Sequence, residues 1–425
     1  MPPKRVIAWA LYDWANSAFA TTVIAGFFPL FFKLHWSAGA DPTESTFRLG
    51  LANSVASIVI VLLAPVLGAI ADRGGARKRF LLFFATMGII MTGGLYLVEQ
   101  GSWAVAMALY ALGMIGFSGG NVFYDALIVE VADDAQVDFV SALGFAMGYL
   151  GGGLLFAFDV LMTLYPDSFG LADRSEAVRV AFLSVALWWA LFSVPVFLLV
   201  PEPIRPRDGR SWTAAVRGGF AQLAATFAHL RQLRMTFLFL LAYWLYIDGV
   251  DTIVRMAVDY GITLGFDSNG LIVALLITQF VGFPAALAFG RLGQRWGAKR
   301  AILLAIGVYV LVVAWAYRMQ QSWEFYGLAV AIGLVQGGIQ SLSRSFYARL
   351  IPRDKCGEFF GFYNMLGKFA AVIGPALMGW VSLATGNPRL SILSISVLFI
   401  LGAGLLLRVD ECEGHRQARV LEEPA

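Results

Sequence analysis

Two related stretches decide how this chain folds, Gly68-Ala-Ile-Ala-Asp72-Arg-Gly-Gly75-Ala-Arg-Lys78 and Gly290-Arg-Leu-Gly-Gln294-Arg-Trp-Gly297-Ala-Lys-Arg300. Each closes a long apolar run with glycines and bases at matching spacing, one in each half of the chain. A repeat of this kind predicts a duplicated architecture, with a site between the two halves.

The composition indicates which environment surrounds these apolar runs. Of 425 residues, 59% are hydrophobic and 14% are charged, and the mean hydropathy is +0.72. A soluble domain has about a quarter of its residues charged, so the chain is predicted to be an all-α protein embedded in a lipid bilayer. Because a crossing needs about 20 apolar residues, the length accommodates about twelve helices and no large soluble domain.

Apolar runs bounded by charges and by Pro/Gly clusters predict two groups of six helices. The first group is expected near 6–33, 48–71, 79–98, 103–124, 138–163 and 178–200, and the second near 235–258, 269–291, 300–318, 323–345, 358–384 and 389–408. The predicted domains are an N-terminal bundle (1–200), a linker (201–234), a C-terminal bundle (235–408) and a tail (409–425). In the linker, apolar residues from Trp212 to Leu230 recur at helical spacing, which predicts an amphipathic helix on the membrane surface or on the protein's own cytoplasmic face.

Basic residues set the expected orientation, because cytoplasmic loops retain them. With the N-terminus inside, most Lys and Arg residues outside the helices fall on the cytoplasmic side, so both termini are predicted to be cytoplasmic. A loop containing Glu130, Asp133, Asp134 and Asp138 has no base and departs from this rule.

Several other classes of function lack their signatures. The net charge of +3 forms no single basic patch, which argues against a nucleic-acid partner. The sequence has no phosphate-cradling loop, nucleophile elbow or zinc-binding helix. We therefore predict no enzyme activity, no cofactor and no metal site. The two cysteines, Cys356 and Cys412, indicate no disulfide framework.

The stretch from Gly68 to Arg79 resembles the loop-two signature of the major facilitator superfamily. The resemblance implies a gating role for Gly68, Asp72, Arg73, Gly75 and Arg77, with Asp72 accepting a hydrogen bond between the halves or facing the N-terminus of the eleventh helix. Arg295 belongs to the degenerate second copy. Ala76 stands where the family usually has a base, which implies a weaker latch. The alternative is that these charges only set the topology.

Further motifs resemble the branch of that superfamily that contains the autophagy-related vacuolar amino-acid effluxer and its bacterial relatives. They are Tyr12-Asp-Trp-Ala-Asn16 with Thr21-Thr22, Asn121-Val-Phe-Tyr124-Asp125, Ser141-Ala-Leu-Gly144, Gln340-Ser-Leu-Ser-Arg344 and Phe359-Phe-Gly-Phe-Tyr363. The resemblance implies two six-helix bundles that rock about a central site, amino acids as first candidate solutes, a monomer as the working unit and a place in a bacterial inner membrane.

Charges inside the predicted helices are the candidates for the mechanism, because a charge in the bilayer usually faces a wet cavity or a partner. Asp248 and Asp251 lie three residues apart on one predicted face of helix seven, and Arg255 follows one turn later. Either carboxylate is a candidate for proton coupling; alternatively, Asp251 and Arg255 form a static pair.

Helices ten and eleven offer further polar groups. Lys368, with Asn364 one turn before it, is predicted to neutralise a helix-seven carboxylate or to bind a substrate carboxylate. Gln336, Gln340 and Arg344 form one stripe at four-residue spacing, with Arg344 near the cytoplasm as a gate partner.

Helices one and four complete the candidate site. Asp13, Asn16 and Thr21 lie in helix one, where Asp13 is a candidate gate or proton residue. Tyr124, Asp125 and Glu130 are expected to pair with bases such as Arg73 or Arg77 and not to contact substrate.

The sequence thus predicts a secondary active transporter that moves a small solute by alternating access, coupled to protons and acting in efflux. Two alternatives stay open. A lipid or glycolipid transporter of the same fold should have a lateral opening, and a non-transporting receptor or assembly factor should tolerate neutral replacements of Asp248 and Asp251.

Overall fold

The computed structural model describes residues 3–37, 42–74, 76–202, 233–263 and 268–422. Within its helices, some side chains also lie outside the described part, among them those of Arg73, Arg255 and Lys368. The predicted amphipathic helix of the linker and Gly75 lie outside the described residues.

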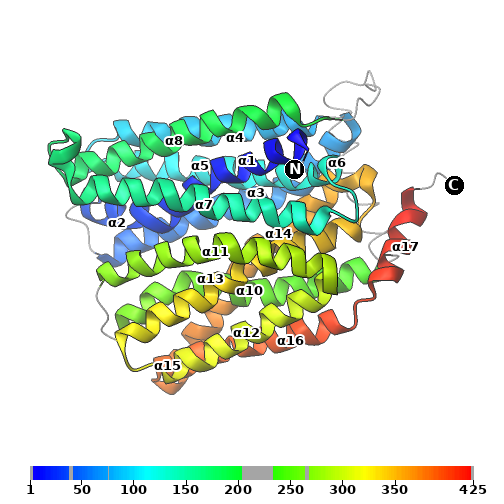
Figure 1. Ribbon diagram of the computed structural model, residues 1–425. Coiled ribbons are helices and arrows are strands. Elements are labelled where there is room, and N and C mark those ends of the chain that lie inside the picture. Colours follow the sequence, from blue (N-terminus) through cyan, green and yellow to red (C-terminus); the bar gives the residue numbers. More distant parts are fainter. Residues whose placement is uncertain (1–2, 38–41, 75, 203–232, 264–267, 423–425) are drawn as a thin grey trace.

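The first half of the chain forms six membrane-crossing segments (Figure 1). In order these are α1 (Lys4–Ala18) continued by η1 (Phe19–Phe27), α2 (Phe28–Phe31) and η2 (Phe32–Trp36); α3 (Pro42–Gly74); α4 (Arg77–Gly94) with η3 (Leu95–Leu97); α5 (Trp103–Ala126) followed by α6 (Ile128–Val131); α7 (Val137–Leu164) followed by η4 (Pro166–Phe169); and α8 (Arg174–Leu199).

The second half repeats the arrangement and adds a tail helix. Its segments are α10 (Arg234–Thr263), α11 (Ser268–Trp296), α12 (Ala298–Arg318), α13 (Ser322–Arg349) with η5 (Arg353–Lys355), α14 (Cys356–Thr385), α15 (Pro388–Ser394), α16 (Ser396–Leu407) and α17 (Glu411–Glu422). The two termini lie at the same end of the bundle, where α17 also lies (Figure 1).

The membrane-spanning character follows from length and hydropathy. In the described part of the chain, ten helical segments are long and apolar enough to cross a bilayer, and shorter apolar stretches, Ile58–Asp72 and Ile373–Thr385, lie in α3 and α14. Together they match the twelve predicted crossings, so the predicted all-α, twelve-helix architecture in two six-helix bundles is confirmed.

The first crossing differs from the single α-helix that was expected. Its middle, η1, is π-helical over nine residues, and η2 is π-helical over five. A π-turn widens the helix and changes the direction of the side chains that follow it, and such turns are frequent at functional sites. Thr21 and Thr22 lie in η1.

Glycines allow the two halves to approach closely along two helix pairs. A Cβ added to Gly68 of α3 would lie 2.2 Å from the carbonyl oxygen of Gly357 in α14, and one added to Gly361 would lie 2.7 Å from Cα of Pro65. On the opposite side, a Cβ on Gly290 of α11 would lie 2.5 Å from that of Ala142 in α7. The pairs α3–α14 and α7–α11 therefore join the halves in a pseudo-symmetric manner.

The α17 helix was not expected from the sequence, which predicted only a tail. It rests on the second half, where the Gln417 side chain accepts from the Met235 backbone N–H at 3.3 Å. It also reaches the first half, since His415 Nε2 lies 3.8 Å from Asp134 Oδ2.

Candidate functional site

A polar cavity of about 350 Å³ lies between the two halves. Both halves contribute to its wall, through α1, η1, α5 and α7 on one side and α10, α11, α13 and α14 on the other. The lining includes most of the candidate residues, namely Asp13, Asn16, Thr21, Asp125, Asp251, Gln336, Gln340, Arg344 and Asn364. Its volume is within the usual range of small-molecule sites.

Arg344 of α13 is the centre of the strongest contacts in this cavity. Its Nη1 donates to Asp125 Oδ1 of α5 at 3.0 Å and lies 3.6 Å from Asp13 Oδ2 of α1. Its Nε and Nη2 donate to the hydroxyl and carbonyl oxygens of Ser141 in α7, both at 2.9 Å. The guanidinium also lies over the Phe145 ring, 4.4 Å from its centroid. A single cation from the second half thus holds three helices of the first half.

These contacts correct one expectation and bear on another. Asp125 was expected to pair with Arg73 or Arg77 and to stay away from substrate, but it pairs with Arg344 and lines the cavity. The expectation that Arg344 is a gate partner near the cytoplasm stays a prediction; its side chain is buried, with 2% of its surface exposed, and lines the cavity. The pairing expected for Asp125 was wrong because spacing along one helix does not show which helix of the other half it will face.

The two carboxylates of helix seven have different environments. Asp248 is buried and does not belong to the cavity lining. Its two oxygens lie 3.0 and 3.1 Å from the Gly374 backbone nitrogen, which donates to them, and Thr252 Oγ1 donates to Oδ1 at 3.3 Å. Gly374 precedes Pro375, whose ring disturbs the helical ladder of α14. Asp248 therefore joins α10 to α14, whereas Asp251 lines the cavity.

Amides and hydroxyls supply the rest of the polar wall. Asn16 donates to Asn121 Oδ1, and Gln279 of α11 donates to Thr21 Oγ1 at 3.3 Å across the halves. Tyr149 donates to Gln340 Oε1 at 3.4 Å, also across the halves. The buried oxygen Oε1 of Gln336 has no hydrogen-bond partner among the described residues.

At the end of the bundle that carries the termini, which we call the closed end, α3 meets the N-terminus of α14. Asp72 accepts from the backbone N–H groups of Gly357 and Glu358 at 3.0 and 2.9 Å. The α14 dipole favours an anion at this position. Arg77 pairs with Asp72 at 2.8 Å and with Glu130 at 3.0 Å, within the first half.

The second copy of the repeat makes the equivalent contact with a neutral residue. Gln294, which matches Asp72 in the repeat, donates to the Ala135 carbonyl just before α7 at 3.3 Å. Arg295 is exposed at the same end. Two related contacts therefore join the halves at the closed end, one through the charged side chain of Asp72 and one through the neutral side chain of Gln294.

Several contributing residues were not predicted. Asp138 of α7 accepts from Ser345 and from Arg349 Nη1, the latter at 2.8 Å, and Arg349 also pairs with Glu411 of α17. The loop from Glu130 to Asp138, which contains acids and no base, could have indicated these contacts, because buried acids without local bases need basic partners elsewhere in the structure. Ser141 belongs to one of the motifs that carry the family resemblance, but neither Ser141 nor Tyr149 was assigned a role.

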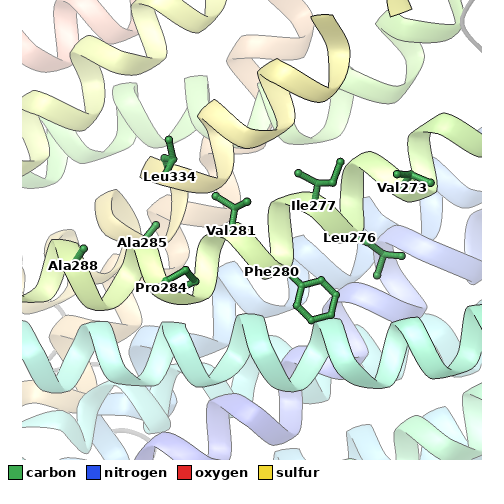
Figure 2. Close-up of a pocket in the computed structure, with 9 residues that line it drawn as sticks. All are labelled: Val273, Leu276, Ile277, Phe280, Val281, Pro284, Ala285, Ala288 and Leu334. Atoms are coloured by element: carbon green, nitrogen blue, oxygen red, sulfur yellow. The ribbon is translucent and has the colours of Figure 1, made fainter. Parts of the chain in front are cut away.

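An apolar groove lies apart from this cavity (Figure 2). It has a volume of about 680 Å³, and all of its lining residues except Leu334 of α13 belong to α11. Val273 and Phe280 in its wall are 47% and 42% exposed. No lining residue is shared with the polar cavity, so the groove is separate from the candidate site.

Comparisons with solved structures agree with this architecture. The human organic anion transporter MFSD10 matches with a TM-score of 0.72 and 18% identity, over 96% of this chain and 100% of that one. The proton:xylose symporter XylE matches with a TM-score of 0.70 and 15% identity, over 99% and 98% of the two chains. At these identities the likeness shows the major facilitator fold alone.

Sequence comparisons identify the branch of this superfamily. A family model described as "Vacuole effluxer Atg22 like" matches residues 43–138 and 128–419. The uncharacterized MFS-type transporter YxiO of Bacillus subtilis is 37% identical, over 96% of this chain and 95% of its own length. Autophagy-related protein 22 of Yarrowia lipolytica is 26% identical, over 85% of this chain and 75% of its own length. This chain therefore belongs to the Atg22-like family of major facilitator superfamily transporters.

Proposed function

We propose that this transporter exports small amine-bearing metabolites, amino acids first, by alternating access coupled to protons. The observation that carries the proposal is the polar cavity between the halves, which contains carboxylates, amides and tyrosines and is closed toward one end. The described part of its lining contains three carboxylates, Asp13, Asp125 and Asp251, and one base, Arg344. Because Arg344 is already held by Asp125 and Ser141, this wall suits a solute with a positive group.

The direction and orientation belong to the same proposal. The closed end collects most of the bases outside the helices, so it faces the cytoplasm with both termini. The membrane is a bacterial inner membrane, by likeness to the Bacillus subtilis relative. Efflux and amino acids are suggested by the description "Vacuole effluxer Atg22 like", and the working unit is a monomer.

The test uses purified protein in liposomes that contain a pH-sensitive dye. Pools of amino acids, peptides, sugars and drugs are added in turn, and both dye signal and uptake of labelled solute are recorded. We expect the amino-acid pool to move protons and label, and Asp251→Asn to reduce both. The control is Asp159→Asn, because Asp159 is a buried carboxylate of α7 that accepts from Ser184 and does not line the cavity.

Other outcomes would contradict the proposal in different ways. If no pool moves label or protons, solute transport is not the function. If label moves but Asp251→Asn equals wild type and protons do not move, the proton coupling is wrong. Movement of fluorescent lipid between leaflets without movement of any pool would favour the lipid transporter of the same fold.

A further inference from the structure

Tyr149 of α7 is a first-half side chain that lies between two glycines of the second half. A Cβ added to Gly282 of α11 would lie 3.0 Å from one edge of its ring, at Cδ1, and a Cβ added to Gly337 of α13 would lie 2.7 Å from the other edge, at Cε2. The ring is 8% exposed and lines the polar cavity. The two glycines, which we call the glycine socket, leave the space that the ring fills.

Other aromatic side chains of the cavity wall are supported by neighbouring rings. Tyr243 and Tyr363 stack on each other, with ring centroids 4.2 Å apart, and Tyr124 stacks on Trp9 with centroids 4.5 Å apart. Tyr149 instead has glycines at both of its edges. If its ring is removed, no side chain of the glycine socket can take its place. A recess bounded by α11 and α13 then opens from the cavity.

The Tyr149 ring lies one helical turn from the charged contacts of the cavity, on the side away from the closed end. On α7 it follows Phe145 by four residues, and the Phe145 centroid lies 4.4 Å from the Arg344 guanidinium. On α13, Gln340 precedes Arg344 by four residues and accepts from the Tyr149 hydroxyl at 3.4 Å. Four residues advance a helix by about 6 Å. A solute whose charged groups lie beside Arg344 and its partners can therefore reach Tyr149 with its side chain.

We propose that Tyr149 is a specificity-determining residue of this transporter, and that its ring, by filling the glycine socket, sets the largest side chain that the cavity accepts. This inference rests on the proposed function and deepens it, because it assigns the size limit of the solute to one contact between the halves. The charged groups hold the head of the solute, and the Tyr149 ring limits what is attached to that head.

Opposite changes at this contact should have opposite effects. Tyr149→Ala removes the ring, and because packed interiors collapse only in part around a deleted side chain, the recess stays open to larger solutes. Gly337→Ala places a Cβ 2.7 Å from Cε2 of the ring. Since Gly282 of α11 lies against the other edge, the ring has to move into the cavity, which then accepts only smaller solutes.

The first experiment measures size preference in liposomes that contain the full-length protein. Uptake of labelled alanine is inhibited by unlabelled alanine and by unlabelled tryptophan, and the ratio of the two inhibition constants is determined for each variant. Such a ratio does not depend on the fraction of protein that is folded. Because one methylene group in a fitted pocket changes discrimination by roughly tenfold or more, we expect a shift of about that size toward tryptophan in Tyr149→Ala and toward alanine in Gly337→Ala.

Two control variants keep the recess filled. Tyr149→Phe keeps the ring and loses only the hydrogen bond to Gln340, so its ratio should equal that of the wild type. Tyr165→Ala removes a tyrosine that directly follows α7 and is 60% exposed, and it should also leave the ratio unchanged. If Tyr149→Phe shifts the ratio as far as Tyr149→Ala does, the hydroxyl and not the ring determines specificity, and the proposal is wrong.

The second experiment needs no transported solute. Para-cresol has the size and shape of the missing side chain, and engineered apolar cavities bind small aromatic molecules. Binding to the folded state raises the melting temperature. We expect para-cresol to raise the melting temperature of purified Tyr149→Ala beyond any change in the wild type. Its effect on Tyr149→Phe and on Tyr165→Ala should equal its effect on the wild type.

Three results would overturn the inference: no additional stabilisation of Tyr149→Ala by para-cresol, an unchanged ratio in both Tyr149→Ala and Gly337→Ala, or shifts of these two variants in the same direction. If Tyr149→Ala does not fold, the direction of the shift in Gly337→Ala decides. Binding of para-cresol to Tyr149→Ala in a protein that moves no amino acid would contradict the proposed function alone. Alanine uptake with an unchanged ratio in both variants would contradict this inference alone.

Discussion

Replacing Asp72 by asparagine should open the closed end far more often. The carboxylate accepts two backbone N–H groups of α14, from Gly357 and Glu358, and is 2% exposed. An asparagine has one acceptor oxygen in place of two, so its amide must face one of these donors. Hydrogen bonds to a charged group contribute about 1.5–3 kcal/mol each, whereas the pairing with Arg77 lies within one half and persists on opening.

The magnitude follows from the two bonds that cross between the halves. Taking the lower value for each, the closed state loses about 3 kcal/mol relative to the open state. That free energy corresponds to a rise of roughly 150-fold in the open population. Arg344 and Ser141 still hold the halves together, so the protein should remain folded and mostly closed.

The assay uses a native thiol. Cys356 begins α14 beside the latch and is 0% exposed. In a Cys412→Ser background its rate of maleimide labelling reports transient opening. The matched control is Asp134→Asn, because Asp134 pairs with Arg353 at the same end through side chains that are 44% and 50% exposed. An exposed pair contributes about 1 kcal/mol at most, so labelling should rise by about fivefold or less. If Asp72→Asn labels no faster than Asp134→Asn, the latch does not stabilise closure as argued.

Three further predictions concern other contacts. Gly68→Ala should prevent closure, because its Cβ would lie 2.2 Å from the Gly357 carbonyl, so Cys356 should be labelled rapidly in this variant. The control is Gly307→Ala, whose Cβ would have no atom within 4 Å, and its Cys356 should be labelled at the wild-type rate. Asp248→Ala should lower the free energy of unfolding by about 1–3 kcal/mol, since it leaves the Gly374 N–H without its acceptor. In a thermal scan, Asp248→Asn should melt near the wild-type temperature. If a stable Asp248→Asn variant loses proton movement, Asp248 has a transport role instead. Truncation after Val409 removes the Arg349–Glu411 and Asp134–His415 contacts, which are partly exposed, and should raise Cys356 labelling by about tenfold or less; an unchanged rate would mean that α17 does not stabilise closure.

The helices could be predicted because the bilayer leaves few alternatives. Apolar runs of sufficient length, separated by charged loops, must form crossing helices, and the repeat ending at Lys78 and Arg300 divides them into halves. The contact between Asp72 and α14 was implied by the motif that contains it. Helix α17 was missed because its charged residues give no apolar pattern, and its support comes from contacts with distant residues such as Met235.

The site was less predictable because it depends on how helices face one another. Asp248 and Asp251 are separated by three residues, which is about 300° around a helix and leaves them about 60° apart. That angle is enough to direct one toward Gly374 and the other toward the cavity. The pairing of Arg344 with Asp125 likewise depends on the packing of α13 against the first half, which no local pattern specifies. The contacts of Arg255 and Lys368 stay predictions, because their side chains lie outside the described part.

The π-helical middle of the first crossing also bears on how this chain tolerates insertions and deletions. Residues Phe19–Phe27 form wide turns, so a sequence one residue shorter there can adopt ordinary α-helical turns and leave both flanking segments in place. The same deletion within Lys4–Ala18 would rotate one part of the helix by about 100° relative to the other and turn Asp13 away from Tyr124 and Arg344. Length variation among homologues should therefore concentrate in the wide segment.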